Sequence, residues 1–305
     1  MAMVDLLRDV ALDDDTRRRR LYAGDLFLYS PRACSYALCE LGRAMLEEAF
    51  APHDPRTIHH HLRAEETAAI LAKLKPAFIH HPRCKELIPE ILASIGCDLD
   101  LVYFDVPRMR SAYPTDYLTS GIAYAFHPHR DTWYSAPQCQ INWWLPIYPI
   151  TQENGLAFYP NYFRRPIANN SEVYNYYRWN ATSRATAAQH VRADTRIQPK
   201  PQEPVSGPVI TPLPEPGGMI LFSGAQLHAT VENTSGIARY SIDFRTVHRI
   251  DARNRDGAEN IDSRCTGSAI RDYLRARDLA RLPDEVIDVY NDGTELSEGP
   301  LTYGA

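Results

Sequence analysis

Residues 239–245 read Arg-Tyr-Ser-Ile-Asp-Phe-Arg, and polar and apolar side chains alternate throughout this stretch. Residues two apart on a β-strand share a face. One face would therefore carry Arg239, Ser241, Asp243 and Arg245, and the other Tyr240, Ile242 and Phe244. We expect the apolar face to pack outward against helices and the charged face to line the inside of a barrel. Burying such charges costs several kcal/mol unless each finds a partner. The stretch therefore predicts a β-strand whose inner face lines a polar site, where these charges find partners.

Short strand-like segments recur around this stretch, between about residues 98 and 250. The candidates are 99–105, 118–124, 138–145, 156–159, 219–222, 227–232 and 239–248. Many short strands without a regular alternation of strand and helix favour a jelly roll or sandwich over a parallel sheet. The fold class expected is therefore mainly β with helical decoration.

The remaining segments are expected to surround this core within a single domain, 1–305. Residues 1–97 read as a helical N-terminal part, because apolar residues recur there at helical spacing. An insertion at about 161–216 is aromatic and then proline-rich, which predicts a lid over the barrel mouth. Residues 251–305 predict a helical C-terminal extension that contains one helix at 268–282.

Composition excludes some partners. The formal net charge is −5, so there is no general basic field for nucleic acid. No apolar stretch is long enough to cross a bilayer, and the six cysteines form no CxxC pair. We expect a cytoplasmic protein that acts on a small molecule and binds neither nucleic acid nor membrane. Whether the protein forms a homo-oligomer stays open.

His129 and Asp131 lie two apart, so on a strand both would face the inside of the barrel. With the distant His228 they supply two imidazoles and one carboxylate. This ligand set suits non-haem Fe(II) and leaves coordination positions for a co-substrate and O2. The alternative is a chance His-x-Asp pair with His228 as a hydrogen-bonded core histidine. Arg239 favours the metal site, because a bound dicarboxylate would neutralise a buried guanidinium through two parallel hydrogen bonds. For both Arg239 and Arg245, an ion pair with Asp243 and no ligand is the alternative.

Taken together, these residues resemble the Fe(II)/2-oxoglutarate-dependent dioxygenases, and their spacing resembles the phytanoyl-CoA hydroxylase-like branch. Residues 153–160, ENGLAFYP, are similar to a strand of that branch, and residues 216–222, PGGMILF, resemble the strand that leads into the distal histidine. Met219 stands where the branch often has an acid, and Asn161-Tyr162-Phe163 replaces its frequent Gly-Ser-His. The resemblance covers roughly residues 98–250.

The resemblance implies a cupin-like double-stranded β-helix packed against the N-terminal helices. It implies Fe(II) at His129, Asp131 and His228, and 2-oxoglutarate bound to the iron with its distal carboxylate at Arg239 and Ser241. O2 would oxidise both substrates, with formation of succinate and CO2. Related halogenases carry a small residue where Asp131 stands, so hydroxylation is expected here. Desaturation, cyclisation and epoxidation stay open.

Other candidate site residues flank these motifs. Gln140 and Asn142 share a polar strand face and would bond the co-substrate or the ligand carboxylate, unless that face meets solvent. The candidate substrate contacts are Trp133, Tyr134, Arg178, Trp179 and Arg245. Core packing is the alternative for Trp133 and Tyr134, and an oligomer contact for the run that contains Arg178 and Trp179.

The expected substrate is a small polar molecule of specialised metabolism, with carboxylated or phosphorylated molecules among the candidates. The arginines considered for such an anion are Arg130, Arg164, Arg165, Arg178 and Arg245. Two other functions are weighed against this one. The first uses the same triad for an oxidation or epoxidation without 2-oxoglutarate, and the second is a non-catalytic jelly-roll binding module.

Overall fold

The computed structural model describes residues 4–123, 127–182, 186, 189–191, 196 and 198–294, and two β-sheets form its centre. The main sheet has the strand order β1-β2-β7-β5-β9-β3-β10, and β4 also pairs with β9. Its strands are β1 (Leu6–Arg8), β2 (Leu26–Tyr29), β3 (Val102–Phe104), β4 (Arg108–Ala112), β5 (Ile141–Pro146), β7 (Met219–Ser223), β9 (Arg239–His248) and β10 (Leu274–Arg275). The minor sheet consists of β6 (Leu156–Phe158) and β8 (His228–Thr230).

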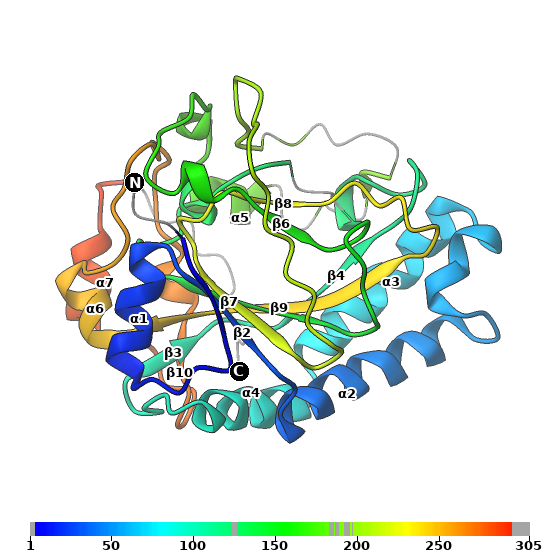
Figure 1. The fold of residues 1–305 in the computed structure, drawn as a ribbon, viewed down its shortest axis with the longest axis horizontal. Helices are drawn as coiled ribbons and strands as arrows, with labels where there is room; N and C mark the ends of the chain where they lie inside the picture. Colours follow the sequence, from blue (N-terminus) through cyan, green and yellow to red (C-terminus); the bar gives the residue numbers. More distant parts are fainter. Residues whose placement is uncertain are drawn as a thin grey trace.

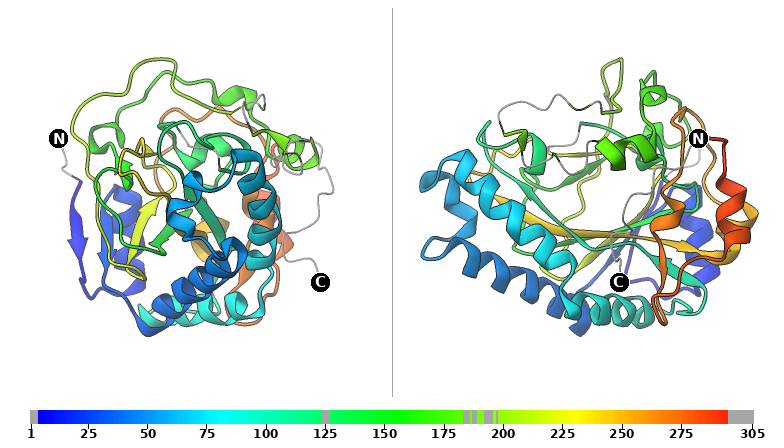
Figure 2. Two further views of the ribbon diagram at one scale, coloured as in Figure 1. Left: turned by 90° about the vertical axis from the view of Figure 1, so that its right-hand side faces the viewer. Right: turned by 180° about the vertical axis from the view of Figure 1, so that it is seen from behind.

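Helices cover the outside of the main sheet, and the minor sheet lies on its other side (Figure 1). The α-helices are α1 (Asp14–Ala23), α2 (Ala33–Phe50), α3 (Ala64–Ile79), α4 (Pro82–Ser94), α5 (Tyr176–Thr182), α6 (Arg249–Asn254) and α7 (Asp284–Ile287). Short 3-10 helices are η1 (Pro55–His60), η2 (Gly121–Ala123), η3 (Asp131–Tyr134), η4 (Pro160–Tyr162), η5 (Ser171–Val173), η7 (Ala269–Asp272) and η8 (Asp288–Tyr290). The views in Figure 2 show α2, α3 and α4 running along one side of the molecule. None of the described helices combines the length and apolar character that spanning a bilayer requires.

Strand β9 is the structural centre, and the alternation read from its sequence is confirmed. It pairs with β5 along one edge and with β4 and β3 along the other. Its outer residues Tyr240, Ile242 and Phe244 are fully buried among apolar residues of α2, α3 and α4. Helix α2 packs closely on the sheet at Gly42, where a Cβ would lie only 3.0 Å from Cδ1 of Ile147 and in ordinary contact with Ile242. The opposite side chains of β9 face the space between the two sheets. This mainly β core with helical decoration is the expected jelly-roll fold.

The structure corrects three expectations about elements. The N-terminal part is not only helical, because Leu26–Tyr29 is a fully buried strand that joins β7 and carries β1 with it. The strand expected at 118–124 is wrong: residues 118–120 are irregular, 121–123 form η2, and Tyr124 lies outside the described residues. The actual strand here is β4, directly after Pro107.

The third correction concerns the helix expected at 268–282. The segment forms η7 and then β10, which pairs with β3. The edge of β3 offers unpaired backbone groups, and pairing with them outweighs the helical spacing of the sequence. The insertion at 161–216 contains η4, η5 and α5, and parts of it lie outside the described residues.

The packing of β9 predicts a stability difference between two identical substitutions. Ile242→Ala should lower the free energy of unfolding by about 2–5 kcal/mol, because it leaves a cavity under α2. Ile250→Ala, on α6, is the matched control, since Ile250 is 46% exposed. Denaturant unfolding measures both. Equal losses would contradict the role given to the outer face of β9.

Candidate active site

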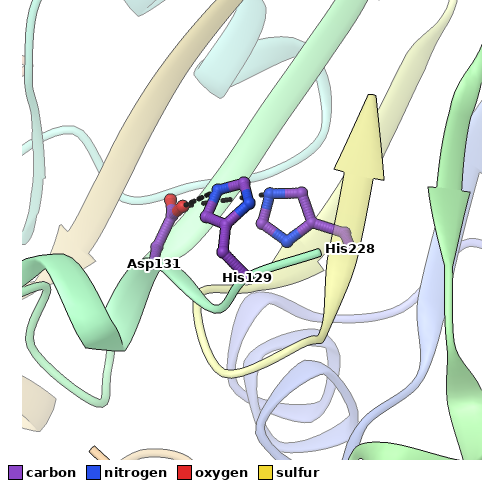
Figure 3. A group of neighbouring side chains, drawn as sticks. All are labelled: His129, Asp131 and His228. Atoms are coloured by element: carbon purple, nitrogen blue, oxygen red, sulfur yellow. Dashed lines mark ion pairs between the residues drawn. The ribbon is translucent and has the colours of Figure 1, made fainter. Parts of the chain in front are cut away.

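His129, Asp131 and His228 converge between the two sheets, with their side chains pointing toward one another (Figure 3). One ligand atom from each lies within 4.8 Å of the others, and all three residues are buried. The Oδ1 atom of Asp131 lies 3.4 Å from Nε2 of His129 and 3.8 Å from Nε2 of His228. Two imidazoles and a carboxylate at these distances can bind one divalent metal ion, occupying one face of its coordination octahedron.

The backbone explains how residues 99 positions apart in the chain meet. His129 and His228 form an isolated antiparallel bridge, in which each N–H donates to the carbonyl of the other at 2.9 Å. Asp131 does not continue a strand, contrary to the alternation expected for the His-x-Asp pair. It is the first residue of η3, and that turn directs its carboxylate back toward the two histidines.

Backbone carbonyls determine which nitrogen of each histidine faces the metal position. Nδ1 of His129 meets the carbonyl of His127 at 2.8 Å, and Nδ1 of His228 meets the carbonyl of Gln226 at 3.0 Å. A carbonyl accepts only from a protonated nitrogen, so in the neutral form of each ring the proton is on Nδ1 and the lone pair of Nε2 is directed at the site. Burial, helped by His129, lowers the pKa of His228 to about 4. The imidazole is therefore neutral at physiological pH, as metal binding requires.

The second oxygen of Asp131 is held by a buried polar network. The amide of Gln140 donates to Oδ2 at 2.8 Å, and Nε of Arg245 lies 3.6 Å from the same oxygen. Gln140 is itself fixed, because its Oε1 accepts from the hydroxyl of Tyr273 at 2.7 Å and its Nε2 also donates to Asn142 at 2.7 Å. Gln140 and Asn142 are 1% and 4% exposed. The solvent-facing alternative for this strand face is therefore wrong.

Neighbouring charged and polar groups also shift the pKa of Asp131. Burial alone would raise the pKa of this carboxyl, but the contact with His129 and the charge of Arg245 outweigh it and hold the pKa far below its usual range. Arg245 in turn lies 3.2 Å from Asp105 and 3.9 Å from Asp243. Three carboxylates therefore surround one guanidinium. The ion-pair alternative is therefore correct for Arg245, whose positive charge offsets the negative charge of these carboxylates beside the metal position.

Arg239 differs from Arg245 in its partners. It is 3% exposed, its Nη1 donates to the Ser241 hydroxyl at 2.9 Å, and its Nε has no hydrogen-bond partner. Asp243 is taken by Arg110, whose Nε lies 2.5 Å from it. Among the described residues, no carboxylate lies within ion-pair distance of Arg239, and burial lowers its pKa to about 10. The ion-pair alternative for Arg239 is wrong, and its guanidinium can still accept an anion.

A cavity of about 570 Å³ joins these groups. It contains the three metal-ligand candidates and Arg239, and it extends to residues of α3 and α5. Between the ligand set and Arg239 its walls are mostly apolar. They are formed by Trp144, Leu156, Phe222 and Thr230, with the ring of Trp144 lying 5.4 Å below the guanidinium of Arg239.

The remaining candidates divide into those that line this cavity and those that do not. Tyr134 and Trp179 line it. Trp133 does not: it is fully buried, donates its indole N–H to Asp262 at 2.8 Å, and packs in a separate apolar cluster. Arg178 is exposed on α5 and lies outside the cavity lining.

The other arginines considered for a substrate anion also lie elsewhere. Arg130 donates to the carbonyls of Ala225 and Tyr162, at 2.6 Å each, and pairs with Asp262, so it holds the loops together. Arg164 and Arg165 are exposed. Sequence reasoning missed Lys75, Asp105 and Tyr273, all of which line the cavity. Lys75 and Tyr273 lie in segments read as plain helix, and no local motif marks them.

Comparison with known proteins gives a family. The family model described as phytanoyl-CoA dioxygenase (PhyH) matches residues 22–241. No curated protein sequence matches the chain significantly. Similar solved structures include EvdO2 from Micromonospora carbonacea var. aurantiaca, at 12% identity over 79% of this chain and 94% of that chain, with a TM-score of 0.45. EctD from S. alaskensis with bound Fe is 15% identical over 79% of each chain, with a TM-score of 0.38. The family assignment comes from the family model and not from these structures.

The network around Asp131 predicts an effect on metal affinity. Gln140→Leu should weaken Co(II) binding by about 10- to 100-fold, because Oδ2 of Asp131 loses the hydrogen bond that orients it. Gln138→Leu is the matched control, since Gln138 lies on the same segment and outside the cavity lining. Anaerobic titration followed by visible absorption gives both affinities. Equal values in the two variants would show that Gln140 does not orient the carboxylate.

Proposed function

The chain belongs to the phytanoyl-CoA dioxygenase family of non-haem iron, 2-oxoglutarate-dependent oxygenases, and from that premise we propose that it hydroxylates a small polar molecule. In the proposed reaction, a substrate C–H bond, O2 and 2-oxoglutarate give a C–OH bond, succinate and CO2. One atom of O2 enters the substrate and the other enters succinate, so the four-electron reduction of O2 is matched by two two-electron oxidations.

The donor atoms fit the iron that this reaction requires. We assign Fe(II) to His129, Asp131 and His228, because two imidazoles and one carboxylate are ligands that non-haem Fe(II) prefers. Bound iron supplies the redox chemistry by which O2 oxidises 2-oxoglutarate and the substrate. Gln140 and Arg245 hold the second oxygen of Asp131 and keep the first one directed at the metal position.

The observation that carries the proposal is the buried, cavity-facing guanidinium of Arg239. An unpaired buried charge is costly, and a carboxylate that accepts two parallel hydrogen bonds would offset that cost. The Ser241 hydroxyl lies beside it to donate a further bond. The apolar walls between Arg239 and the ligand set suit the two methylene groups of 2-oxoglutarate. Asn142, 4% exposed, faces the same space.

The competing functions account for fewer of these features. An oxidation or epoxidation without 2-oxoglutarate leaves Arg239 without an anion. A binding module gains nothing from three convergent metal ligands. Asp131 supports hydroxylation in particular, because a carboxylate occupies the position that a halide would need.

Anaerobic addition of Fe(II) and 2-oxoglutarate tests the proposal. The wild-type protein should develop the weak visible charge-transfer band of 2-oxoglutarate bound to Fe(II). His228→Ala should lose the band. Arg239→Ala should need about 10- to 100-fold more 2-oxoglutarate to produce it, because a charge-assisted hydrogen bond is lost. Arg178→Ala, which removes an exposed arginine outside the cavity, is the matched control and should titrate like the wild type.

Two outcomes would contradict the proposal in different ways. If iron binds and no band forms in the wild type, the triad works without 2-oxoglutarate. If iron does not bind, the protein is a binding module.

A further inference from the structure

One cation of the cavity lining, Lys75, has no carboxylate partner among the described residues. Six basic and four acidic side chains line the cavity. Asp105 pairs with Arg108 and Arg245, Asp243 pairs with Arg110, and Asp272 accepts from the hydroxyl of Tyr176. Arg239 is assigned to 2-oxoglutarate. Among the residues that the structure describes, no carboxylate lies within ion-pair distance of Lys75. The contacts proposed for 2-oxoglutarate do not include it.

Lys75 lies near the end of α3, and its amine enters one corner of the cavity. Its Nζ donates to the carbonyl of Ile122 and lies 3.4 Å from the Ser111 hydroxyl. An ammonium has three donors, so one remains for a ligand. Arg196 donates to the adjacent carbonyl, that of Gly121, at 3.3 Å. Two consecutive carbonyls of η2 thus bring two cations to the same corner.

The environment of Lys75 disfavours its charge. Burial and the nearby Arg110 lower the pKa of Lys75 to about 7, although Asp243 acts in the opposite direction. A bound anion would favour the ammonium form and contribute binding free energy in return. The same environment makes this amine more reactive at neutral pH than an exposed lysine.

A row of rings connects this corner with the iron site. The rings of His129 and Tyr134 lie 5.4 Å apart, those of Tyr134 and Tyr174 5.2 Å, and those of Tyr174 and Trp179 5.7 Å. The guanidinium of Arg196 lies 5.2 Å from the Trp179 ring. Tyr134, Tyr174 and Trp179 all line the cavity, so they form one continuous aromatic wall between the iron site and the two cations.

We propose that Lys75, with Arg196 beside it, binds an anionic group at the end of the substrate remote from the iron. The substrate is then an elongated organic anion, a carboxylate or a phosphate ester, whose apolar body lies along Tyr134, Tyr174 and Trp179. Its oxidised carbon lies several bonds from the charge. This inference rests on the proposed function, since it takes the iron site as the position of the reacting carbon.

The lysines of the chain provide a matched control. There are four, at positions 73, 75, 85 and 200, against 29 arginines. Lys73 is exposed on the same helix, two residues before Lys75. Lys75→Met removes the charge at nearly the same side-chain length, Lys75→Arg keeps it, and Lys73→Met removes a charge outside the cavity lining.

Three probes test the proposal on the protein loaded anaerobically with Fe(II) and 2-oxoglutarate: 3-phenylpropionate, phenyl phosphate and the neutral 3-phenylpropanamide. Calorimetry should show at least one anion binding the wild type about 10-fold more tightly than the amide. The stronger of the two anions identifies the head group. Lys75→Met should abolish the preference, while Lys75→Arg and Lys73→Met retain it. Equal binding of anion and amide to the wild type, or an unchanged preference in Lys75→Met, would overturn the proposal.

Chemical labelling keeps the proposal testable if Lys75→Met does not fold. Reductive methylation of the wild type near pH 7, followed by peptide mapping, should show that phenyl phosphate or 3-phenylpropionate slows modification of Lys75 several-fold and leaves Lys73 unaffected. Equal protection of Lys75 and Lys73, or no protection of either, would contradict the proposal.

The charge-transfer band separates the proposed function from the substrate inference, because all Lys75 variants should keep the band. Its absence from the wild type would contradict the proposed function, whereas its presence without a Lys75 effect would contradict only the substrate inference.

Discussion

The burial of charge on the inner face of β9 is the constraint on which the rest of the site depends. The strand lies inside the main sheet, so water screens Arg239, Asp243 and Arg245 less than it would at a surface. Asp243 is neutralised from β4 by Arg110, and Arg245 by Asp105 and Asp131. Because Asp131 belongs to the same network, its carboxylate is oriented by the charges that stabilise the strand. Fold stability and metal-site geometry are therefore properties of one set of interactions.

Sequence alone predicted the parts of this arrangement that follow from strand periodicity. The separation of the two faces of β9 follows from the alternation over residues 239–245, and the strand continues to His248 after that alternation ends. The same alternation placed Gln140 and Asn142 together, although it could not decide between interior and solvent. The structure shows that this face is interior, because the amide of Gln140 donates a hydrogen bond to Asp131. The role of Arg245 was undecided for a similar reason: its partner Asp105 lies 140 positions away, and distant pairs leave no local pattern.

The errors concern segments whose structure is imposed by tertiary contacts. Leu26–Tyr29 is too short to show a period, and it forms a strand because the edge of β7 is available. Residues 274–275 pair with β3 although their surroundings have helical spacing. That pairing has a functional consequence, since it places Tyr273 against Gln140. Tyr273 lies beyond the region matched by the family model, which ends at residue 241. The C-terminal segment thus adds to the support of Asp131.

We propose that the buried arginine of β9 and the three convergent ligands serve one 2-oxoglutarate-dependent oxygenation. The most direct measurement is the mass of the succinate formed when the protein is given Fe(II), 2-oxoglutarate and 18O2 at high enzyme concentration, where slow turnover without the primary substrate suffices. Each succinate molecule should carry one 18O atom in its new carboxylate. Iron-loaded protein that forms no succinate, or succinate without the label, would contradict the proposal.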